Sequence, residues 1–248
     1  QQQALKMARQ SMVLLKNEKQ LLPLSSKIKK IALLRPNANN GTTQLGNYNG
    51  IPSKNATLLD ALRAEKGIEV VYDSISDFIT LQPGIDLQHY AEKYKDVDLI
   101  IYAGGISALL EGEEGDTGNV EGFYRGDRTT INLPAVQTQV MQMLQKSGKP
   151  MIFICMSGSA IAFNWESQHI PAIIQAWYGG QAAGTALADI LFGRYNPSGK
   201  LPITFYRSDS DLPAIEDYSM KNRTYRYFNG DVLYPFGYGL SFTKFKFK

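Results

Sequence analysis

Short apolar runs alternate with amphipathic segments along most of the chain. Uninterrupted apolar runs are typical of strands covered on both faces of a sheet, and apolar positions three and four residues apart predict helices. The alternation predicts an α/β fold with a mostly parallel sheet and helices on both sides. The predicted strands are 31–34, 68–72, 99–102, 151–154 and 172–177, with 203–206 as a candidate sixth, and the predicted helices are 4–17, 57–65, 134–147 and 181–192.

Signals at the helix ends support two of these helices. Val136, Val140 and Leu144 recur at helical spacing in the third predicted helix, and Pro134 suits its first turn. Gly193 follows the apolar face of the fourth helix and suits a C-terminal cap.

The chain divides into a central part and two ends of different character. Residues 1–24 are predicted to form an N-terminal helix and a connector, and residues 25–206 the α/β core. Residues 207–248 are irregular and rich in tyrosine and phenylalanine, which a solvated coil does not need. We therefore expect this C-terminal extension to pack back on the core or against another domain.

The composition is that of a globular protein and argues against several classes of function. Of the 248 residues, 44% are hydrophobic and 20% are charged, and the net charge of +3 is scattered, which argues against a nucleic-acid partner. No apolar run reaches the roughly 18 residues that a membrane helix needs, so no membrane partner is predicted. The first ten residues lack the apolar stretch of a secretory signal, but a mature or truncated protein would lack it too.

The single cysteine and the two histidines indicate neither an internal disulfide nor a metal site. Cys155 stands alone within the apolar run 150–156, so it cannot form an internal disulfide and is expected to fill a buried strand. His89 and His169 have no acid or cysteine at the spacing of a metal site. We predict no metal ion and no cofactor.

The strongest candidate for chemistry is the acidic segment 104–129, which begins where the strand 99–102 runs out. It places Glu111, Glu113 and Glu114 among glycines. Open α/β sheets bind ligands just beyond the carboxyl ends of their strands, so these glutamates are candidates for a catalytic acid or base. Composition alone favours a solvated charged loop, because most charge clusters are of that kind.

Two other motifs are incomplete. A serine hydrolase needs G-x-S-x-G after a strand, and neither Ser107 nor Ser159 completes it. Residues 179–184 contain three glycines between a strand and a helix, but with the wrong spacing for a dinucleotide fingerprint and without the lysine of a phosphate loop. We interpret these small residues as packing residues that let the helix start close to the strand.

Several motifs, taken in order, resemble the second domain of family 3 glycoside hydrolases. The signature is an E-G-E type acidic motif at 111–113, followed by Gly-Asp-Arg-Thr at 126–129 and Leu-Pro at 133–134. Each motif is weak alone, but the ordered set spans about 230 residues and is highly specific. The other matching segments are 13–17 with 21–24, 36–38, 45–50, 177–180, 188–193, 196–202, 225–228 and 234–241.

The resemblance implies a fold and a reaction. The family's second domain is a three-layer αβα sandwich with a mostly parallel six-stranded sheet. Its enzymes are mostly retaining, exo-acting β-glycosidases that release glucose, xylose or N-acetylglucosamine, and retaining chemistry needs two carboxyl groups roughly 5–5.5 Å apart. In the family the nucleophile is an aspartate on a preceding TIM-barrel domain, and the acid/base is usually a glutamate on a loop of the sandwich domain.

Carried onto this sequence, the acid/base falls among three glutamates. The common family pattern E-G-E-G-x-D-R favours Glu113, with Glu111 second and Glu114 third. The sequence departs from that pattern because Glu114 replaces a glycine and about a dozen residues separate the acids from Asp127 and Arg128. We expect those two residues to support the far end of the loop as an ion pair rather than to take part in the chemistry.

The resemblance also implies what accompanies the chain. We expect a fragment of a larger β-glucosidase or β-xylosidase that also has a barrel domain, and we expect the chain alone not to hydrolyse glycosides. Its partners would be β-linked glucoside or xyloside oligosaccharides and that barrel, while its oligomeric state stays open. Relatives mostly act outside the cytoplasm, which suggests a periplasmic or secreted location.

Two alternatives stay open beside this hypothesis. One is a stand-alone carbohydrate-binding or scaffold domain without catalysis, and the other, on fold alone, is a nucleotide-binding α/β domain. Trp177 and Tyr178 could stack on a sugar, but they follow an apolar strand and are interpreted as core residues.

Overall fold

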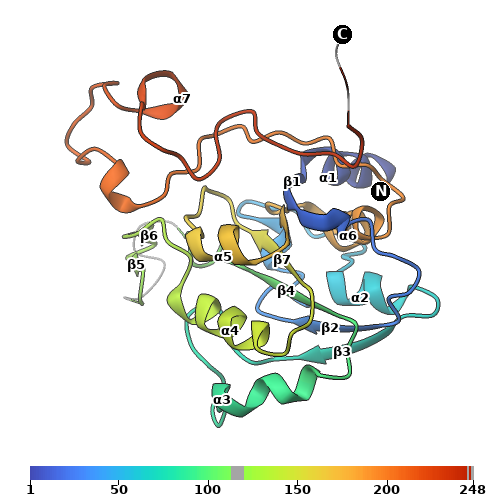
Figure 1. The fold of residues 1–248 in the computed structure, drawn as a ribbon. Coiled ribbons are helices and arrows are strands. Elements are labelled where there is room, and N and C mark those ends of the chain that lie inside the picture. Colours follow the sequence, from blue (N-terminus) through green and yellow to red (C-terminus); the bar gives the residue numbers. More distant parts are fainter. Residues whose placement is uncertain (113–119, 245, 247–248) are drawn as a thin grey trace.

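Six strands form the central sheet of the protein (Figure 1). The structure, a computed structural model, describes residues 1–112, 120–244 and 246. The strands lie in the order β1-β8-β7-β4-β2-β3, and each neighbouring pair is parallel except β1 with β8. The six are β1 (Val13–Asn17), β2 (Lys30–Leu34), β3 (Glu69–Asp73), β4 (Leu99–Gly105), β7 (Met151–Met156) and β8 (Ala172–Gln175), while β5 (Phe123–Tyr124) and β6 (Asp127–Arg128) form a separate antiparallel hairpin.

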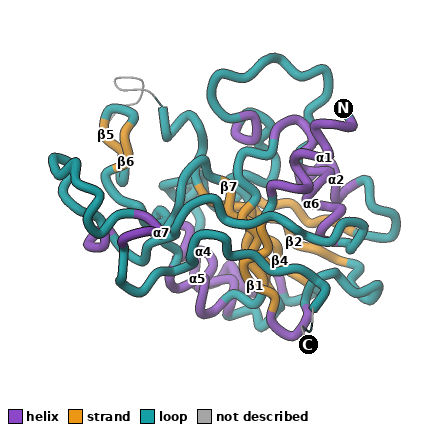
Figure 2. Tube along the Cα trace, turned by 90° about the horizontal axis from the view of Figure 1, so that it is seen from above, coloured by secondary structure: helices purple, strands orange, loops and turns teal. Residues whose placement is uncertain are grey.

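Helices cover both faces of the sheet, which completes a three-layer αβα sandwich (Figure 2). Side chains of a strand alternate between its faces, so Ile31 and Leu33 join one hydrophobic cluster and Ala32 and Leu34 the other. The predicted fold class is therefore confirmed. The first cluster is covered by α1 (Gln2–Ser11), α2 (Leu58–Arg63) and α6 (Ala183–Leu191), and the second by α3 (Leu87–Tyr90), α4 (Ala135–Gln145) and α5 (Asn164–His169).

The remaining helical turns are short. Four are single 3-10 turns between the main elements, and one more, η5, lies with the last helix in the C-terminal extension. They are η1 (Glu18–Gln20), η2 (Thr43–Leu45), η3 (Ala91–Tyr94), η4 (Gly180–Ala182), η5 (Asp209–Asp211) and α7 (Thr224–Tyr227).

Local sequence explains where the predicted helices begin. At α2 the Thr57 side chain accepts a hydrogen bond from the Asp60 backbone, and the Asp60 side chain accepts one from the Thr57 backbone, which forms a capping box. At α4, Pro134 precedes the first turn, and Val140 and Leu144 are fully buried. The helices predicted at 57–65, 134–147 and 181–192 are thus confirmed, with ends within two residues of those expected.

The predicted helix 4–17 is wrong in its second half. The helix α1 ends at Ser11, and Val13–Asn17 forms the edge strand β1, antiparallel to β8. Val13, Leu14 and Leu15 are all buried. Three adjacent buried side chains cannot share one face of a surface helix, whereas a strand covered on both faces accommodates them.

The candidate strand 203–206 is also corrected. Phe205 makes an isolated antiparallel bridge with Tyr234, and the sixth strand of the sheet is β1. This bridge is part of the return of the C-terminal extension, where Tyr234 packs on Phe163 with ring centroids 6.0 Å apart. Farther along, the Leu240 amide donates to the Leu14 carbonyl at 2.8 Å.

The middle of the C-terminal extension is far less buried. Ile215 and Tyr218 have 85% and 92% of their surface exposed. Residues 207–232 lie at the same end of the molecule as the β5–β6 hairpin in both views (Figures 1 and 2). The division of the chain at residues 24 and 206 stays a prediction.

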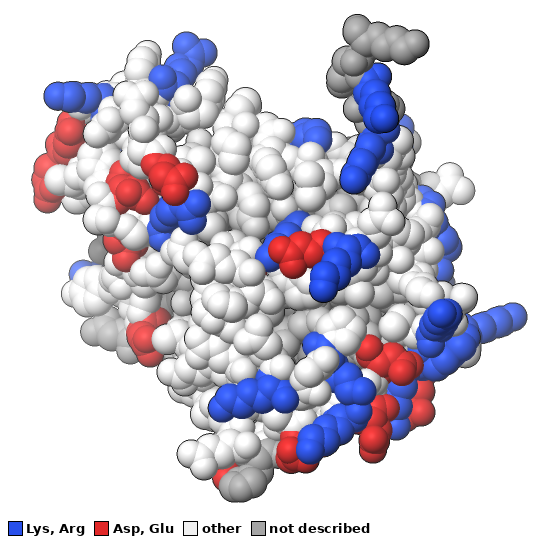
Figure 3. Space-filling view, in the orientation of Figure 1, with Lys and Arg blue, Asp and Glu red and all other residues white. Residues whose placement is uncertain are grey.

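Charged side chains of both signs are mixed on the surface. On the face drawn in Figure 3, lysines and arginines stand beside aspartates and glutamates, and uncharged side chains cover much of the centre. Among the helices that the structure describes, none combines the length and apolar character that crossing a membrane requires.

Candidate functional site

The carboxyl ends of three central strands meet at one edge of the sheet. Gly105 at the end of β4 pairs with Met156 at the end of β7, and Cys155 pairs with Gln175 at the end of β8. The segments that follow these strands are therefore neighbours in space. This edge is where an open α/β sheet places its ligands.

The end of β4 is held by two buried amide side chains. Gln137 of α4 accepts from the Gly105 amide at 2.9 Å and donates to the Gly105 carbonyl at 2.7 Å. Asn37 donates to the carbonyls of Gly104 and Ile106. Gly105 has φ +104° and a Cβ there would lie 2.0 Å from the Met156 carbonyl oxygen, so only glycine fits. The start of the acidic segment is thus rigidly placed.

A short turn follows the strand and directs Glu111 back toward the sheet. The amides of Leu110 and Glu111 both donate to the Ser107 carbonyl at 3.0 Å. Ser107 itself is buried. Because the turn is closed by backbone hydrogen bonds, the Glu111 side chain leaves it in a defined direction.

The Glu111 carboxylate accepts three hydrogen bonds from the segments after β7 and β8. Its donors are the Ser159 hydroxyl, the Gly158 amide at 3.1 Å and the Tyr178 hydroxyl at 2.5 Å. Burial raises the pKa of the Tyr178 phenol, and the nearby Glu111 charge raises it further. The phenol therefore stays a proton donor to the carboxylate across the physiological pH range.

Arg128 of β6 reaches the same serine from the other side. Its Nη1 donates to the Ser159 hydroxyl at 2.7 Å and to the Ala160 carbonyl at 2.8 Å, and its Nε donates to the Thr130 carbonyl at 3.2 Å. Burial lowers the pKa of the guanidinium, and the Glu111 charge opposes that shift. Arginine nevertheless stays protonated in proteins, so the group is cationic here.

The sequence-predicted site residues are only partly brought together. Glu111 and Arg128 lie on either side of Ser159, whereas Glu113 and Glu114 lie outside the described residues. No ion pair joins Asp127 to Arg128, both of which the structure describes, and Asp127 is exposed. The expected ion pair is therefore wrong: Nε and Nη1 of the guanidinium donate to carbonyl and hydroxyl oxygens, and its buried Nη2 has no hydrogen-bond partner among the described residues.

Two residues of this cluster escaped the sequence analysis. Ser159 had been considered only as a nucleophile, and Tyr178 had been interpreted as a core residue. The interpretation of Tyr178 is wrong, since the side chain is only partly buried and its hydroxyl binds Glu111. The available signal was position, because both residues stand within three residues of the end of a central strand.

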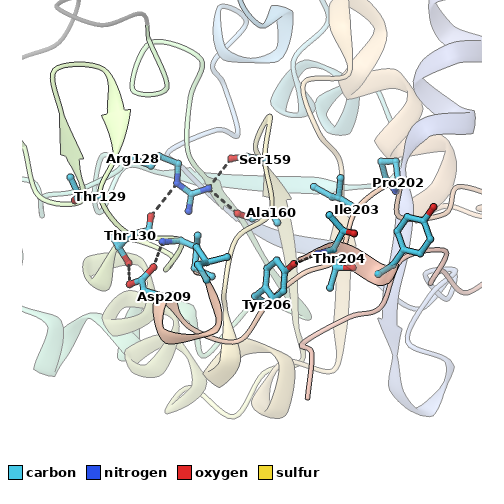
Figure 4. A pocket seen from close by; sticks show the side chains of 14 residues that line it. Arg128, Thr129, Thr130, Ser159, Ala160, Pro202, Ile203, Thr204, Tyr206 and Asp209 are labelled. Atoms are coloured by element: carbon cyan, nitrogen blue, oxygen red, sulfur yellow. Dashed lines mark hydrogen bonds between the residues drawn. The ribbon is translucent and has the colours of Figure 1, made fainter. Parts of the chain in front are cut away.

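A cavity of about 590 Å³ opens beside Arg128 and Ser159 (Figure 4). Its far wall comes from residues 202–212 and from α7, and Asp209 joins the two sides by accepting from the Thr130 hydroxyl at 2.7 Å. The Thr204 hydroxyl is buried and has no hydrogen-bond partner in the described part of the chain. A concave, mostly apolar wall with a few polar groups is typical of small-molecule sites. Aromatic and aliphatic members of the lining are Tyr206, Tyr225, Ile131, Ile203 and Leu212.

The remaining motifs show packing rather than ligand binding. The Gly184 amide donates to the Ala56 carbonyl, and a Cβ on Gly184 would lie 2.1 Å from the Thr57 carbonyl oxygen. This close approach supports the packing interpretation of residues 179–184. Within residues 1–112 and 120–244, no three histidine, cysteine, aspartate or glutamate side chains gather as a metal-binding group.

Comparison with known sequences gives one family over nearly the whole chain. Residues 12–242 match the family described as "Glycosyl hydrolase family 3 C-terminal domain". A Xylan 1,4-beta-xylosidase of Xylanibacter ruminicola is 46% identical over 84% of this chain and 25% of that protein. A Periplasmic beta-glucosidase of Salmonella typhimurium is 32% identical over 98% of this chain and 34% of that protein.

Comparison with solved structures also finds glycosidases that match nearly the whole chain. A GH3 exo-beta-xylosidase, XlnD, in complex with a xylobiose aziridine probe has a TM-score of 0.82 and 29% identity, over 97% of this chain and 31% of that one. A beta-glucosidase from Listeria innocua in complex with isofagomine has a TM-score of 0.77 and 27% identity, over 96% and 33%. The chain thus spans between a quarter and a third of the length of these four proteins.

Proposed function

The chain belongs to glycosyl hydrolase family 3 as a C-terminal domain, and we propose that it supplies the general acid/base of a retaining β-glycosidase. The observation that carries the proposal is the family match over residues 12–242, together with the glutamates that follow the carboxyl end of β4. Glu113 is the first candidate for the acid/base, Glu111 the second and Glu114 the third.

The second carboxyl group of the reaction comes from elsewhere in the enzyme. Retaining hydrolysis needs a nucleophile roughly 5–5.5 Å from the acid/base, and the family resemblance assigns that role to an aspartate of a TIM-barrel domain. The relatives named above are three to four times longer than the matched region, which leaves room for such a domain in them. The glutamate protonates the leaving oxygen in the first step and activates water in the second.

The substrate class follows from the relatives. The relative at 46% identity is a Xylan 1,4-beta-xylosidase, and others are β-glucosidases. We infer a β-linked xyloside or glucoside, with xylosides tested first. Xylose and glucose rings differ by one hydroxymethyl group, so kcat/KM for matched aryl β-xylosides and β-glucosides on the full-length enzyme decides between them.

The acid/base role is tested in the full-length enzyme that contains this domain. Replacing Glu113 by alanine is expected to lower kcat/KM on a phenyl glycoside about 10²–10⁴-fold, because general acid catalysis contributes that much. A dinitrophenyl glycoside, whose leaving group needs little protonation, is expected to lose far less in its kcat/KM. An equal loss on both substrates would contradict the assignment of Glu113, and Glu111 and Glu114 would then be replaced in turn.

The isolated chain is expected to be inactive. Without the nucleophile no glycosyl-enzyme can form, so purified residues 1–248 should release no aryl leaving group above a mock preparation. Turnover that co-purifies with the chain and disappears in the Glu113→Ala, Glu111→Ala and Glu114→Ala variants would overturn the two-domain mechanism.

A carbohydrate-binding domain without catalysis is the second candidate. The cavity beside Arg128 favours it, because Tyr206 and Tyr225 offer rings, and the buried Thr204 hydroxyl and Arg128 Nη2 have no hydrogen-bond partner among the described residues. Calorimetric titration of the isolated chain with xylo- and cello-oligosaccharides distinguishes the two. Binding that is abolished by Tyr225→Ala, together with a full-length enzyme insensitive to all three glutamate replacements, would favour this candidate.

The location follows the same relatives. One of them is a Periplasmic beta-glucosidase, so we infer a periplasmic or secreted enzyme. Cell fractionation of the source organism with an antibody to this domain tests that inference.

A further inference from the structure

One hydroxyl, that of Ser159, connects two side chains from opposite ends of the acidic segment. Ser159 donates to Glu111 Oε1 and accepts from Arg128 Nη1 at 2.7 Å. Figure 4 shows Arg128 directed at Ser159 and at the Ala160 carbonyl from the side of the β5–β6 hairpin. We call Glu111, Ser159 and Arg128 together the Ser159 clasp.

The clasp joins the two roots of the segment that carries Glu113. Glu111 lies directly before that segment, and Arg128 lies on the second strand of the hairpin that follows it. Both roots are held on the turn after β7, at positions 47 to 48 residues from Glu111 and 31 to 32 residues from Arg128. Glu111 and Arg128, which flank residues 113–119 in the sequence, are therefore held at the same place on the sheet edge.

Each member of the clasp is fixed by further bonds. Glu111 also accepts from the Gly158 amide and the Tyr178 hydroxyl. Arg128 also donates to the carbonyls of Thr130 and Ala160. Hydrogen bonds between ionised groups and hydroxyls are among the stronger ones in proteins, and in this partly buried setting they are screened little.

We propose that the Ser159 clasp positions the general acid/base, and that Glu111 is a positioning residue rather than the proton donor. The inference rests on the proposed function, since it needs a glutamate of the held segment as acid/base. A displacement of about 1 Å in a reacting group can cost about 10²-fold in rate. Loosening either root of the segment therefore weakens proton donation without touching the nucleophile.

The first test is Ser159→Ala in the full-length enzyme, with the exposed Ser53→Ala as the matched control. Ser159→Ala removes the central hydroxyl of the clasp and leaves both of its charged partners, Glu111 and Arg128. We expect kcat/KM on a phenyl glycoside to fall about 10- to 100-fold and on a dinitrophenyl glycoside less than about threefold. Ser53→Ala should change neither. Equal losses on both substrates would mean a merely structural role and would overturn the proposal.

Tyr178→Phe is the second variant, and it tests the proposal independently if Ser159→Ala does not fold. It removes one donor to Glu111 and keeps the ring in place. We expect the same selective loss on the phenyl glycoside, about three- to tenfold, because two of three bonds to the carboxylate remain. Unchanged activity in both Tyr178→Phe and a folded Ser159→Ala would overturn the proposal.

Azide separates a positioning glutamate from the acid/base itself. Azide attacks a glycosyl-enzyme without a base, so it restores turnover of activated substrates only where the base is missing. Glu111→Gln is expected to show the selective loss without azide rescue, and Glu113→Ala to show both. Rescue of Glu111→Gln with release of glycosyl azide would make Glu111 the acid/base and overturn the proposal.

The same variants distinguish failure of the clasp from failure of the proposed function. No selective loss in any of the three glutamate variants would refute the proposed function. Selective loss and azide rescue in Glu113→Ala, beside an unaffected Ser159→Ala, would refute the clasp alone.

Discussion

Asp189 binds two arginines and ties three helices together. Its carboxylate accepts from Arg9 Nε at 2.8 Å and from Arg194 Nε at 2.7 Å. Arg194 continues to Glu65, just beyond the last residue of α2. The Asp189 side chain is 6% exposed, so its removal leaves two half-buried cations without their shared counter-charge.

We predict that Asp189→Asn destabilises the fold. The free energy of unfolding should fall by about 2 kcal/mol, below the range for fully buried pairs because the arginines remain partly solvated. Urea unfolding followed by circular dichroism measures it. The control is Glu92→Gln, which breaks the exposed pair with Lys95 and should cost about 0–1 kcal/mol. If both changes lowered the free energy of unfolding equally, the burial of Asp189 would contribute nothing to stability.

Glu166 is a buried acid on α5 with a different consequence. Its carboxylate accepts from the Thr138 hydroxyl at 2.5 Å, and the residue is 1% exposed. Burial raises the pKa of the Glu166 carboxyl, and the Thr138 hydrogen bond offsets only part of that shift. The folded state therefore holds this proton to a higher pH than the unfolded state does.

The sign of the pH effect follows from that difference. Stability contributed by the protonated acid is complete below the unfolded pKa of about 4.3 and is lost as pH rises through the folded pKa. We predict that the stability of Glu166→Gln relative to the natural chain increases with pH over this window and then levels off. Urea unfolding across a pH series measures it, with the exposed Glu69→Gln as control. A difference that does not vary with pH would contradict the prediction.

Among the elements, β1 shows where local pattern ceases to be informative. Its apolar run continues directly from an amphipathic helix, and its antiparallel pairing with β8 joins residues 13–17 to residues 172–175. Nothing local distinguishes a last helical turn from an edge strand there. The strands β2, β3, β4, β7 and β8 were predictable because each is a separate apolar run between polar breaks.

The short helix α5 was not predicted, and the reason is similar. Its sequence has no apolar stripe, and its buried residue is the acidic Glu166. In the site, Glu111 and Arg128 were found because they belong to recognisable motifs. Ser159 and Tyr178 were missed as partners because they meet Glu111 only through the strand order, 48 and 67 positions away along the chain.

The connection after α6 depends on a close approach to the turn between α1 and β1. A Cβ on Gly199 would lie 2.3 Å from the Met12 carbonyl oxygen, which is backbone and cannot yield. We predict that Gly199→Ala costs about 1–3 kcal/mol of unfolding free energy, as overpacking does. Thermal unfolding measures it against Gly50→Ala, where a Cβ meets nothing within 4 Å. Equal melting temperatures of the two variants would contradict this account of the approach.

At the scale of the whole molecule, the last segment closes the fold. Leu233 and Tyr234 are 8% exposed and pack on the face beside Phe205, while Leu240 pairs with β1 at the other end of the same segment. Residues 233–240 thus run from the face beside Phe205 to the antiparallel edge strand β1. The C-terminal extension therefore has two parts: an exposed middle around Ile215 and Tyr218, and a later part from Leu233 onward that packs on the core.

We predict that truncation after residues 233–242 leaves the melting temperature nearly unchanged, whereas truncation before them lowers it strongly. A chain that stops after Thr243 keeps these contacts, and its melting temperature should change by less than about 3 °C, equivalent to about 1 kcal/mol. A chain that stops after Asp231 loses at least three large side chains at about 1.5–3 kcal/mol each, a large part of ordinary domain stability. We expect a melting temperature at least about 10 °C lower, or no folded protein. Similar melting of both truncated chains would contradict a structural role for residues 233–242.

The Ser159 clasp has a consequence for how such domains diverge and can be re-engineered. The clasp holds Glu111 and Arg128 at the sheet edge regardless of how many residues separate them in the sequence. A connection twice as long would lower the stability of the fold by only about 0.6 kcal/mol. Residues between Glu111 and Arg128, apart from the glutamate that serves as acid/base, are therefore open to exchange as a cassette, provided that the two anchors and their serine are kept. Transplanting that cassette between relatives offers a route to new leaving-group preferences on an unchanged scaffold.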